Sequence, residues 1–206
     1  MSTGGNPRVT VALLAVLAVA AAVGVVFSLN RMQSRESSGP DLGFAPGFTL
    51  TDADSATFRS TDLAGKVWLV DFFFTRCRGT CPILTGRMLE AQGALQEHAG
   101  WRLVSITVDP EHDTPSVLRA HAEATGMDPE RWVLLTGDKT EVTKLVQQGF
   151  LLPLSRVDDA VEPVLHSTRI LLVDRRGAIR GHYDALDDDA MAALPRDAIR
   201  LLNEKD

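Results

Sequence analysis

The spacing of apolar residues along the chain changes several times, and each change predicts a different element. Residues 67–74, VWLVDFFF, are almost all apolar and rich in β-branched and aromatic side chains. This composition predicts a central strand that is buried on both faces. From residue 82 to residue 98 the apolar positions recur at helical spacing, and Pro82 suits a first helical turn. A strand followed directly by a helix is therefore expected here.

The rest of the chain after residue 47 alternates in a similar way. Apolar and polar residues alternate around a turn over residues 48–58, which predicts an N-terminal β-hairpin. Thr114 and Asp138 precede helical patterns and are suitable caps, and Arg175-Arg176-Gly177 is a hairpin turn between two apolar runs. The further predicted elements are strands over 101–109, 132–137, 167–174 and 178–184, and helices over 114–126, over 138–150 and after 186. This order predicts the α/β class, with a mixed central sheet flanked by helices.

A second apolar pattern lies near the N-terminus. Residues 9–29, VTVALLAVLAVAAAVGVVFSL, form an uncharged run long enough to cross a bilayer as a helix. A cleaved signal peptide and a buried core helix are the alternatives. The run is longer than a normal signal core and more uniformly apolar than a globular helix, which favours an uncleaved transmembrane anchor.

These patterns divide the chain into four parts. We expect a short N-terminal tail over residues 1–8, the transmembrane anchor over 9–29, a solvated linker over 30–46 and one folded domain over 47–206. A chain of 206 residues with 45% hydrophobic residues can build one well-packed core but not two full-sized domains.

The flanking charges do not set the orientation of the anchor, because Arg8 lies on one side and Arg31 and Arg35 on the other. The short tail before a long domain favours export of everything that follows. We therefore expect a single-pass protein of the inner membrane, with its domain in the periplasm or otherwise outside the cytoplasm. Arginine far outnumbers lysine and alanine is abundant, which indicates a bacterium with a GC-rich genome. The net charge of -6, without a Lys/Arg cluster, argues against a nucleic-acid partner.

The two cysteines of the chain, Cys77 and Cys81, directly follow the predicted strand over residues 67–74. In α/β folds the end of a strand and the start of the next helix converge at a common site for chemistry. A structural disulfide, a thiol–disulfide exchange pair and a metal site are the three interpretations. A bridge closing so small a loop constrains the unfolded chain less than a long-range bridge. Thioredoxin-type exchange motifs have two residues between the cysteines, not three.

The spacing discriminates further between these interpretations. Four residues apart on a helical turn, two Cβ atoms are about 5–6 Å apart, wider than the roughly 3.5–4.5 Å of a relaxed disulfide. This separation suits a bound metal somewhat better, although the pair can still oxidise if the turn departs from an ideal helix. Arg76, Arg78 and the helix N-terminus favour thiolates, which would serve either a redox pair or a metal site. Two sulfurs and one imidazole indicate copper more than structural zinc.

The imidazole would come from one of five histidines, His98, His112, His121, His166 and His182. His98 and His121 lie within predicted helices away from the strand ends, and His182 lies in a terminal hairpin strand. His112 follows a strand at the same edge as the cysteines and remains a candidate. His166 is the better one, because it precedes an apolar strand that should pair beside the cysteine strand. A lone histidine there is more often a hydrogen-bonded loop residue.

Asp109 and the acidic run over residues 187–189 are also candidate binding residues. Asp109 ends the strand over residues 101–109, so it should lie at the cysteine edge, either capping the turn or orienting a ligand or thiolate. Asp187-Asp188-Asp189 lacks the glycine and distal glutamate of an EF-hand calcium loop, and fits the N-terminal cap of a helix.

Three segments together resemble the Sco/SenC family, thioredoxin-like copper proteins that assist assembly of the dinuclear copper centre of cytochrome c oxidase. FFFTRCRGTCPILTGRM is similar to the family's F-T-x-C-x-x-x-C-P segment, and SITVDPEHDTP to its S-x-D-P-x-x-D-T-P segment. HSTRILLVDRRGAIRGHYD is similar to its histidine strand and hairpin. The similarity covers about residues 45–203, and the N-terminal anchor also fits.

The resemblance implies a thioredoxin-like fold and copper, as Cu(I) or Cu(II), held by Cys77, Cys81 and His166, with Asp109 near the site. Leu165 departs from the family, which often has Asp before the histidine, and removes a carboxylate that could tune the site. The implied function is a membrane-anchored metallochaperone, whose partner is the copper-bearing subunit of cytochrome c oxidase or another copper chaperone. The alternatives are an enzyme, a thiol–disulfide reductase using Cys77 and Cys81 on the oxidase subunit, and a copper or redox sensor.

Overall fold

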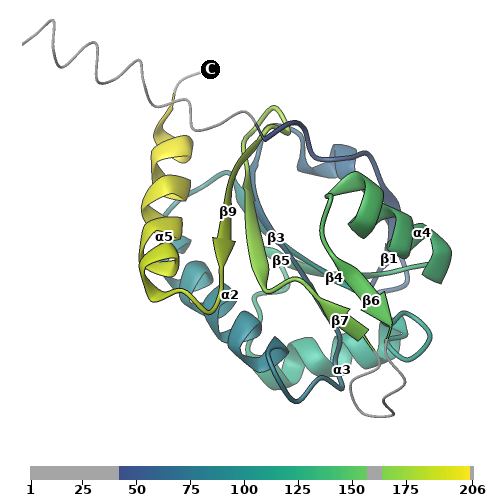
Figure 1. Cartoon of the computed structure of the whole chain (residues 1–206). Coiled ribbons are helices and arrows are strands. Elements are labelled where there is room, and N and C mark those ends of the chain that lie inside the picture. The colour runs from purple at the N-terminus through teal and green to yellow at the C-terminus, as the bar shows by residue number, and fades with distance from the viewer. Residues whose placement is uncertain (1–41, 157–163, 205–206) are drawn as a thin grey trace, which may run out of the picture. The chain divides into compact units, whose positions relative to one another are not determined.

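A seven-stranded mixed sheet organises the residues that the structure, a computed structural model, describes, namely 42–156 and 164–204 (Figure 1). The strand order is β2-β1-β5-β4-β3-β8-β9. β3, β4 and β5 run parallel, whereas β1, β8 and β9 pair with their neighbours in the antiparallel sense. The strands are β1 (Thr49–Asp52), β2 (Thr57–Arg59), β3 (Val67–Phe73), β4 (Trp101–Thr107), β5 (Trp132–Thr136), β8 (Arg169–Val173) and β9 (Ile179–Asp184). The predicted mixed sheet and N-terminal β-hairpin are confirmed.

β3 is the central strand, paired with β4 on one side and β8 on the other. All seven of its residues are buried. Phe72 meets the ring of Phe150 edge-on at 5.2 Å between centroids, while Phe73 stacks on His121 at 5.6 Å. Because neighbouring side chains of a strand point to opposite faces, these contacts show that β3 is covered on both sides, as its apolar sequence predicted.

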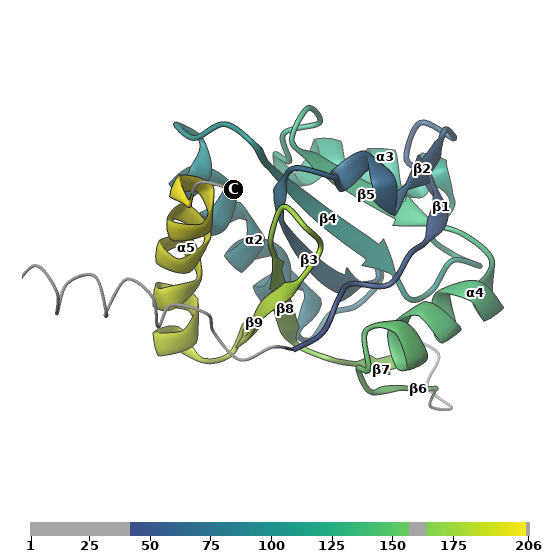
Figure 2. The same ribbon diagram turned by 90° about the horizontal axis from the view of Figure 1, so that it is seen from above.

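Helices cover both faces of the sheet (Figure 2). α2 (Cys81–Leu95), α3 (Pro115–Thr125) and α5 (Asp188–Asn203) lie on one face. α4 (Lys139–Lys144) and the π-helical turn η2 (Leu145–Gly149) lie on the other, and a short 3-10 turn η1 (Ser60–Leu63) follows β2. This arrangement follows from chain direction, because right-handed crossovers from β3 to β4 and from β4 to β5 place α2 and α3 on the same face.

Side-chain caps begin two of these helices where the sequence predicts them. The carboxylate of Asp138 accepts from the backbone N–H of Thr140 and Glu141 at 2.8 and 3.1 Å. Asp187 caps α5 in the same way, which confirms that the acidic run is a helix cap. Thr114 occupies the predicted cap position of α3, but its side chain makes no capping bond.

A two-stranded antiparallel ribbon, β6 (Leu154–Arg156) and β7 (Val164–His166), was not predicted. Its strands are three residues long, too short to show an apolar periodicity of their own. The ribbon lies beside α4, apart from the main sheet (Figure 2).

The predicted tail, anchor and most of the predicted linker lie outside the described residues. Within residues 42–156 and 164–204, no helix is long and apolar enough to cross a membrane. Phe44 forms an isolated bridge with Ala178, and the backbone N–H of Ala45 donates to the carbonyl of Gly177 at 2.8 Å. The chain is thus bound to the turn between β8 and β9 before β1 begins.

Candidate metal centre

The two cysteines lie at the edge of the sheet where β3 ends. Cys77 is in the loop after β3, and Cys81 is the first residue of α2, one position earlier than the predicted start of the helix. The two are not joined in a disulfide. The backbone N–H of Cys81 donates to the sulfur of Cys77 at 3.4 Å. An N–H group at a helix N-terminus favours the thiolate form of a sulfur that it contacts, so the helix prepares Cys77 to bind a cation or attack a disulfide.

The two thiols differ in their surroundings. Cys77 is half-buried, whereas Cys81 is 4% exposed. Burial raises the pKa of the Cys81 thiol well above its usual range, and its hydrogen bond with Cys77 and the negative charge of Asp71 raise it further, against a lowering contribution from the backbone of Phe74. Cys81 is therefore protonated at neutral pH until a cation or a disulfide partner replaces its proton.

Asp71 is a buried charge in the middle of β3. Its carboxylate accepts from Oγ of Ser105 at 2.5 Å, and Ser105 Oγ in turn accepts from Nε1 of Trp132 at 2.8 Å. These bonds link three neighbouring strands, β3, β4 and β5. A single Asp within an apolar strand was the signal in the sequence that could have drawn attention to this residue.

Asp113 fixes the start of the cysteine loop. Its fully buried carboxylate accepts from the backbone N–H of Thr75 at 3.0 Å and from Oγ1 of Thr75 and Thr107, both at 2.5 Å. Nδ1 of His112 lies 2.9 Å from the same carboxylate. Four donors therefore satisfy one buried carboxylate and join the loop after β4 to the residue two positions before Cys77.

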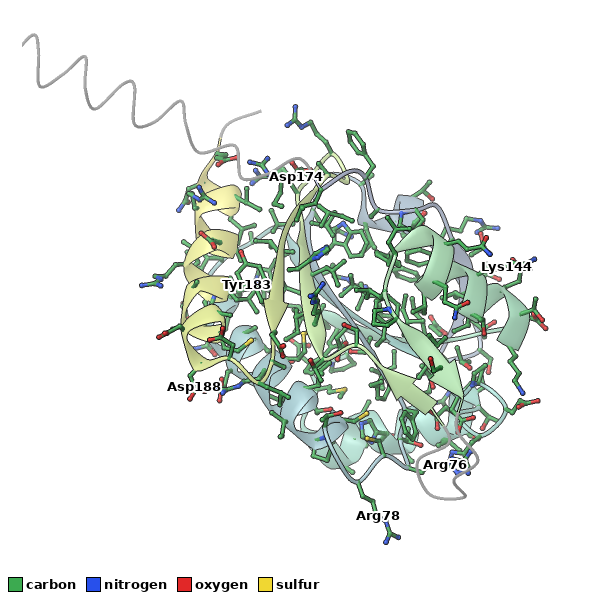
Figure 3. All side chains as sticks on the ribbon, viewed as in Figure 1. Arg76, Arg78, Lys144, Asp174, Tyr183 and Asp188 are labelled. Atoms are coloured by element: carbon green, nitrogen blue, oxygen red, sulfur yellow. The ribbon has the colours of Figure 1, made fainter. Side chains whose placement is uncertain are left out.

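Asp109 lies at the predicted edge and pairs with Arg76, the residue before Cys77. Nε and Nη2 of Arg76 approach Oδ2 of Asp109 at 2.8 and 2.7 Å. Asp109 is buried, whereas Arg76 is partly exposed. Figure 3 shows Arg76 and Arg78 at the same margin of the molecule, with Arg78 projecting away from the ribbon. The observed contact of Asp109 thus holds the backbone before Cys77, and a role of Asp109 toward a ligand stays a prediction.

His166 is the last residue of β7, where it pairs with Leu154 of β6. β8 begins three residues later and runs antiparallel to β3, with Val70 opposite Leu171. β8 therefore starts at the sheet edge where β3 ends, which is the edge of the cysteines. The strand after His166 does pair beside the cysteine strand, as predicted.

The other histidines occupy different positions. His112 lies at the cysteine edge, as predicted, whereas His182 is exposed on β9. His121, expected away from the strand ends, lines a pocket of about 370 Å³ together with both cysteines. Burial lowers the pKa of His121, against an opposing effect of the Asp113 charge. Its placement depends on the rotation of α3 about its axis, which the short helical pattern did not determine.

The chemistry of this edge suits a soft cation or a thiol exchange reaction. Two sulfurs share one site, one of them partly accessible, and carboxylates hold the surrounding loops. Among the side chains that the structure describes, no group of three or more His, Cys, Asp or Glu is placed to hold a metal ion. The described side chains alone thus provide a dithiol.

Known proteins with the same sequence pattern identify the family. The SCO1/SenC family model matches residues 37–197. The SCO1 protein homolog of Bacillus subtilis (strain 168) is 29% identical over 143 residues, which cover 68% of this chain and 74% of the relative. Protein SenC of Rhodobacter capsulatus is 30% identical over 195 residues, covering 92% of this chain and 86% of the relative.

Solved structures share the fold over most of its length. A SCO1/SenC family lipoprotein from Bacillus anthracis str. Ames is 31% identical, with a TM-score of 0.72 over 78% of this chain and 96% of its own. BsSco, a member of the Sco family of cytochrome c oxidase assembly proteins in which a disulfide switch was identified, is 27% identical, with a TM-score of 0.71 over 81% and 98%. Bradyrhizobium japonicum ScoI with copper bound is 27% identical, with a TM-score of 0.64 over 75% and 99%.

These similarities confirm the predicted thioredoxin-like α/β fold and the family resemblance of the three sequence segments. The family model covers the described domain from its first strand into its last helix. The chain belongs to the SCO1/SenC family.

Proposed function

We propose that this chain is a copper metallochaperone that binds the ion through the thiolates of Cys77 and Cys81 and the imidazole of His166. The observation that carries the proposal is the pair of reduced thiols four residues apart, with the N–H of Cys81 bonded to the sulfur of Cys77. Two thiolates and one imidazole form a soft donor set that suits copper. ScoI of Bradyrhizobium japonicum, a relative with the same fold, was solved with copper bound.

His166 is the proposed third ligand because of its place along the chain. It lies three residues before β8, and β8 starts at the edge where β3 ends. The family resemblance assigns the same residue. Asp109 is proposed to support this site through Arg76, whose side chain it holds beside Cys77.

Copper is the cargo of this site, and ligand exchange is the proposed way of delivering it. When copper binds, each cysteine loses its thiol proton to solvent and forms a copper–sulfur bond. An incoming cysteine or histidine of the acceptor can then bind the ion before the donor ligands leave. Cys77 is the accessible sulfur, so we expect the exchange to begin on its side.

The proposed acceptor is the copper-bearing subunit of cytochrome c oxidase, or another copper chaperone that supplies it. BsSco, a structural relative, belongs to a family of cytochrome c oxidase assembly proteins. We further propose that residues 9–29 anchor the chain in the inner membrane and place the domain outside the cytoplasm. A tether of this kind raises the local concentration of the carrier near a membrane-bound acceptor.

Metal analysis of the purified full chain tests the ligand assignment. After reduction and anaerobic loading with copper, we expect one copper per chain in the unmodified protein, and loss of tightly held copper in Cys77→Ser, Cys81→Ser and His166→Ala. His182→Ala is the matched control, because it removes an exposed imidazole from β9 and should retain copper. Full copper retention by His166→Ala would refute the assignment of His166.

A thiol–disulfide reductase is the second candidate, and the unequal burial of the two thiols favours it. A partly exposed Cys77 with a helix N–H at its sulfur can attack a substrate disulfide, and the buried Cys81 thiol can then resolve the mixed disulfide. His166→Ala separates the two functions, because dithiol reduction can survive without the imidazole whereas copper delivery cannot. A sensor that binds copper without transferring it would retain the metal and fail to load any acceptor.

A further inference from the structure

His112 is an exposed imidazole at the cysteine edge, in the loop between β4 and α3. Its side chain is 45% exposed, although the carboxylate that it contacts belongs to the fully buried Asp113. One side of the imidazole therefore contacts a buried carboxylate, while part of the ring is open to solvent.

The hydrogen-bonding groups of His112 are occupied with one exception. Its backbone N–H donates to the carbonyl of Asp109 at 3.0 Å, and its carbonyl accepts from the N–H of Thr114 at 2.9 Å. Nδ1 lies 2.9 Å from the carboxylate of Asp113. With the carboxylate ionised, Nδ1 is the donor of this bond, and a neutral ring then has its lone pair on Nε2. Within the described contacts, Nε2 is the group of this residue that is left for a ligand.

In a metal-binding histidine, the ring nitrogen that does not bind the metal commonly donates a hydrogen bond to a carboxylate. The hydrogen bond from Nδ1 fixes the tautomer and the ring orientation, and it makes the other nitrogen a stronger donor. Neutral imidazole is a good ligand for copper. For His182, by contrast, partial desolvation and then the positive charge of Arg169 lower the pKa of the imidazole. His112 is thus distinguished from His182 by the acid that supports it.

The same carboxylate couples His112 to the cysteine loop. Asp113 binds the backbone N–H and the hydroxyl of Thr75, and Oγ1 of Thr75 lies 3.4 Å from Nδ1 of His112. Thr75 is two residues before Cys77, and two residues of extended chain span at most about 7 Å. The imidazole is therefore connected, through Asp113 and Thr75, to the loop that carries Cys77. Among the described side chains, His112 and the two cysteines do not form a group placed to hold one metal ion together.

We propose that Nε2 of His112 is a transit ligand, which takes a copper ion at the exposed edge of the domain and passes it to the sulfur of Cys77. Nε2 first replaces a water or a chelator atom on the ion. The Cys77 thiol then loses its proton to solvent and forms a copper–sulfur bond, and the bond to Nε2 breaks. The oxidation state of copper does not change in this step. The inference rests on copper being the cargo, as proposed above.

The loading rate of the reduced full chain tests this role. Cu(I) is supplied anaerobically as its bicinchoninate complex, and transfer is followed by the loss of the chelator's visible absorption. His112→Asn retains a side-chain nitrogen donor near the position of Nδ1 and removes Nε2. We expect it to load about tenfold more slowly, with the final copper content unchanged, because only a contact made during transfer is lost. The matched control, His182→Asn, should load at the unmodified rate.

Direct binding is tested in a full chain that carries Cys77→Ser and Cys81→Ser. Cu(II) alone is added at low ratio, and paramagnetic broadening of backbone amide signals locates the ion. We expect broadening centred on residues 109–114, lost when His112→Asn is added and retained with His182→Asn. This readout does not need the cysteine site, so it also decides the question if His112→Asn alters folding.

The outcomes separate this inference from the proposed function. Equal loading rates for His112→Asn and the unmodified chain, or broadening elsewhere than residues 109–114, would overturn the transit role and leave the copper centre standing. Failure of the unmodified chain to retain copper would overturn the proposed function instead, whatever the broadening shows. Slower loading by both His112→Asn and His182→Asn would also contradict a specific role of His112.

Discussion

Two buried carboxylates at opposite ends of the sheet, Asp113 and Asp174, illustrate two uses of the same chemistry. Asp174 accepts from the backbone N–H of Arg176 and Ala178, both at 2.9 Å, and pairs with Arg180 at 3.0 Å. These partners lie within six residues of Asp174, in the turn between β8 and β9 and at the start of β9. Asp113 instead binds Thr75, which is 38 residues away. Figure 3 shows Asp174 far from Arg76, which marks the cysteine edge.

The difference concerns what each carboxylate stabilises. Asp174 shapes a turn that its own sequence neighbours already favour, because Gly177 adopts a positive φ of 84° there. Asp113 determines where a loop with no regular structure of its own lies relative to the next strand. Substitution of either Asp113 or Asp174 should therefore lower the stability of the fold. Only substitution of Asp113 should also weaken copper binding.

The largest effect is expected from Asp113→Asn. The amide nitrogen would face donors, leaving Thr75 or Thr107 without an acceptor inside the protein, and we expect a loss of about 3 kcal/mol in the free energy of unfolding. Urea unfolding followed by circular dichroism measures it. The cysteine loop would also lose its anchor, so copper affinity should fall. Unchanged copper affinity would mean that this bond network does not position Cys77.

A smaller effect is expected from Asp174→Asn, which is the matched control for that substitution. The turn retains one acceptor oxygen and most of its backbone bonds, so about 1–2 kcal/mol of unfolding free energy should be lost. Copper affinity, measured by competition with a chelator, should equal that of the unmodified chain. If both variants weakened copper binding equally, the proposed difference between the two ends would be wrong.

Arg76→Gln tests the second acidic contact at the cysteine edge. It leaves the buried carboxylate of Asp109 without its cation, and because Arg76 is partly exposed we expect a loss of only about 1 kcal/mol. The loop immediately before Cys77 should become more mobile, which amide hydrogen exchange of residues 74–80 would detect. Exchange rates equal to those of the unmodified chain would show that the ion pair does not restrain the loop.

The smallest expected effect is a loss of stability at alkaline pH that is caused by Cys81. Burial raises the pKa of Cys81 above its unfolded value of 9.0, so the unfolded chain releases the thiol proton first. The contribution to stability is complete below pH 9 and falls as pH rises above it, by about 0.8 kcal/mol at pH 9.5. Reduced Cys81→Ala should lack this fall, whereas Asp174→Asn should retain it. A fall of the same size in Cys81→Ala would assign it to another group.

Elements defined by local patterns could be predicted from the sequence. The apolar run of β3, the caps Asp138 and Asp187, and the turn before β9 each depend on residues a few positions apart. The three family-like segments, in the right order, also gave the correct fold. In each case the determining interactions are local, or the segment itself resembles a segment of the family.

Features that depend on contacts between distant segments were missed. Thr114 was expected to cap α3 with its side chain, but the neighbouring Asp113 instead forms the network that holds the cysteine loop. His121 was placed away from the site because the phase of α3 cannot be determined without its packing partner. β6 and β7 are stabilised by pairing with each other, which three-residue segments do not reveal in sequence.

The unequal placement of the two cysteines also bears on whether the fold would depend on the proposed copper ion. Cys81 is part of a helix whose buried residues Leu84, Met88 and Leu95 belong to the core, whereas Cys77 is in a short loop. These core contacts are made by apolar side chains, unlike those of a zinc finger, which unfolds when its metal leaves. If the chain carries copper as proposed, we expect it to stay folded when it releases the ion and to bind another.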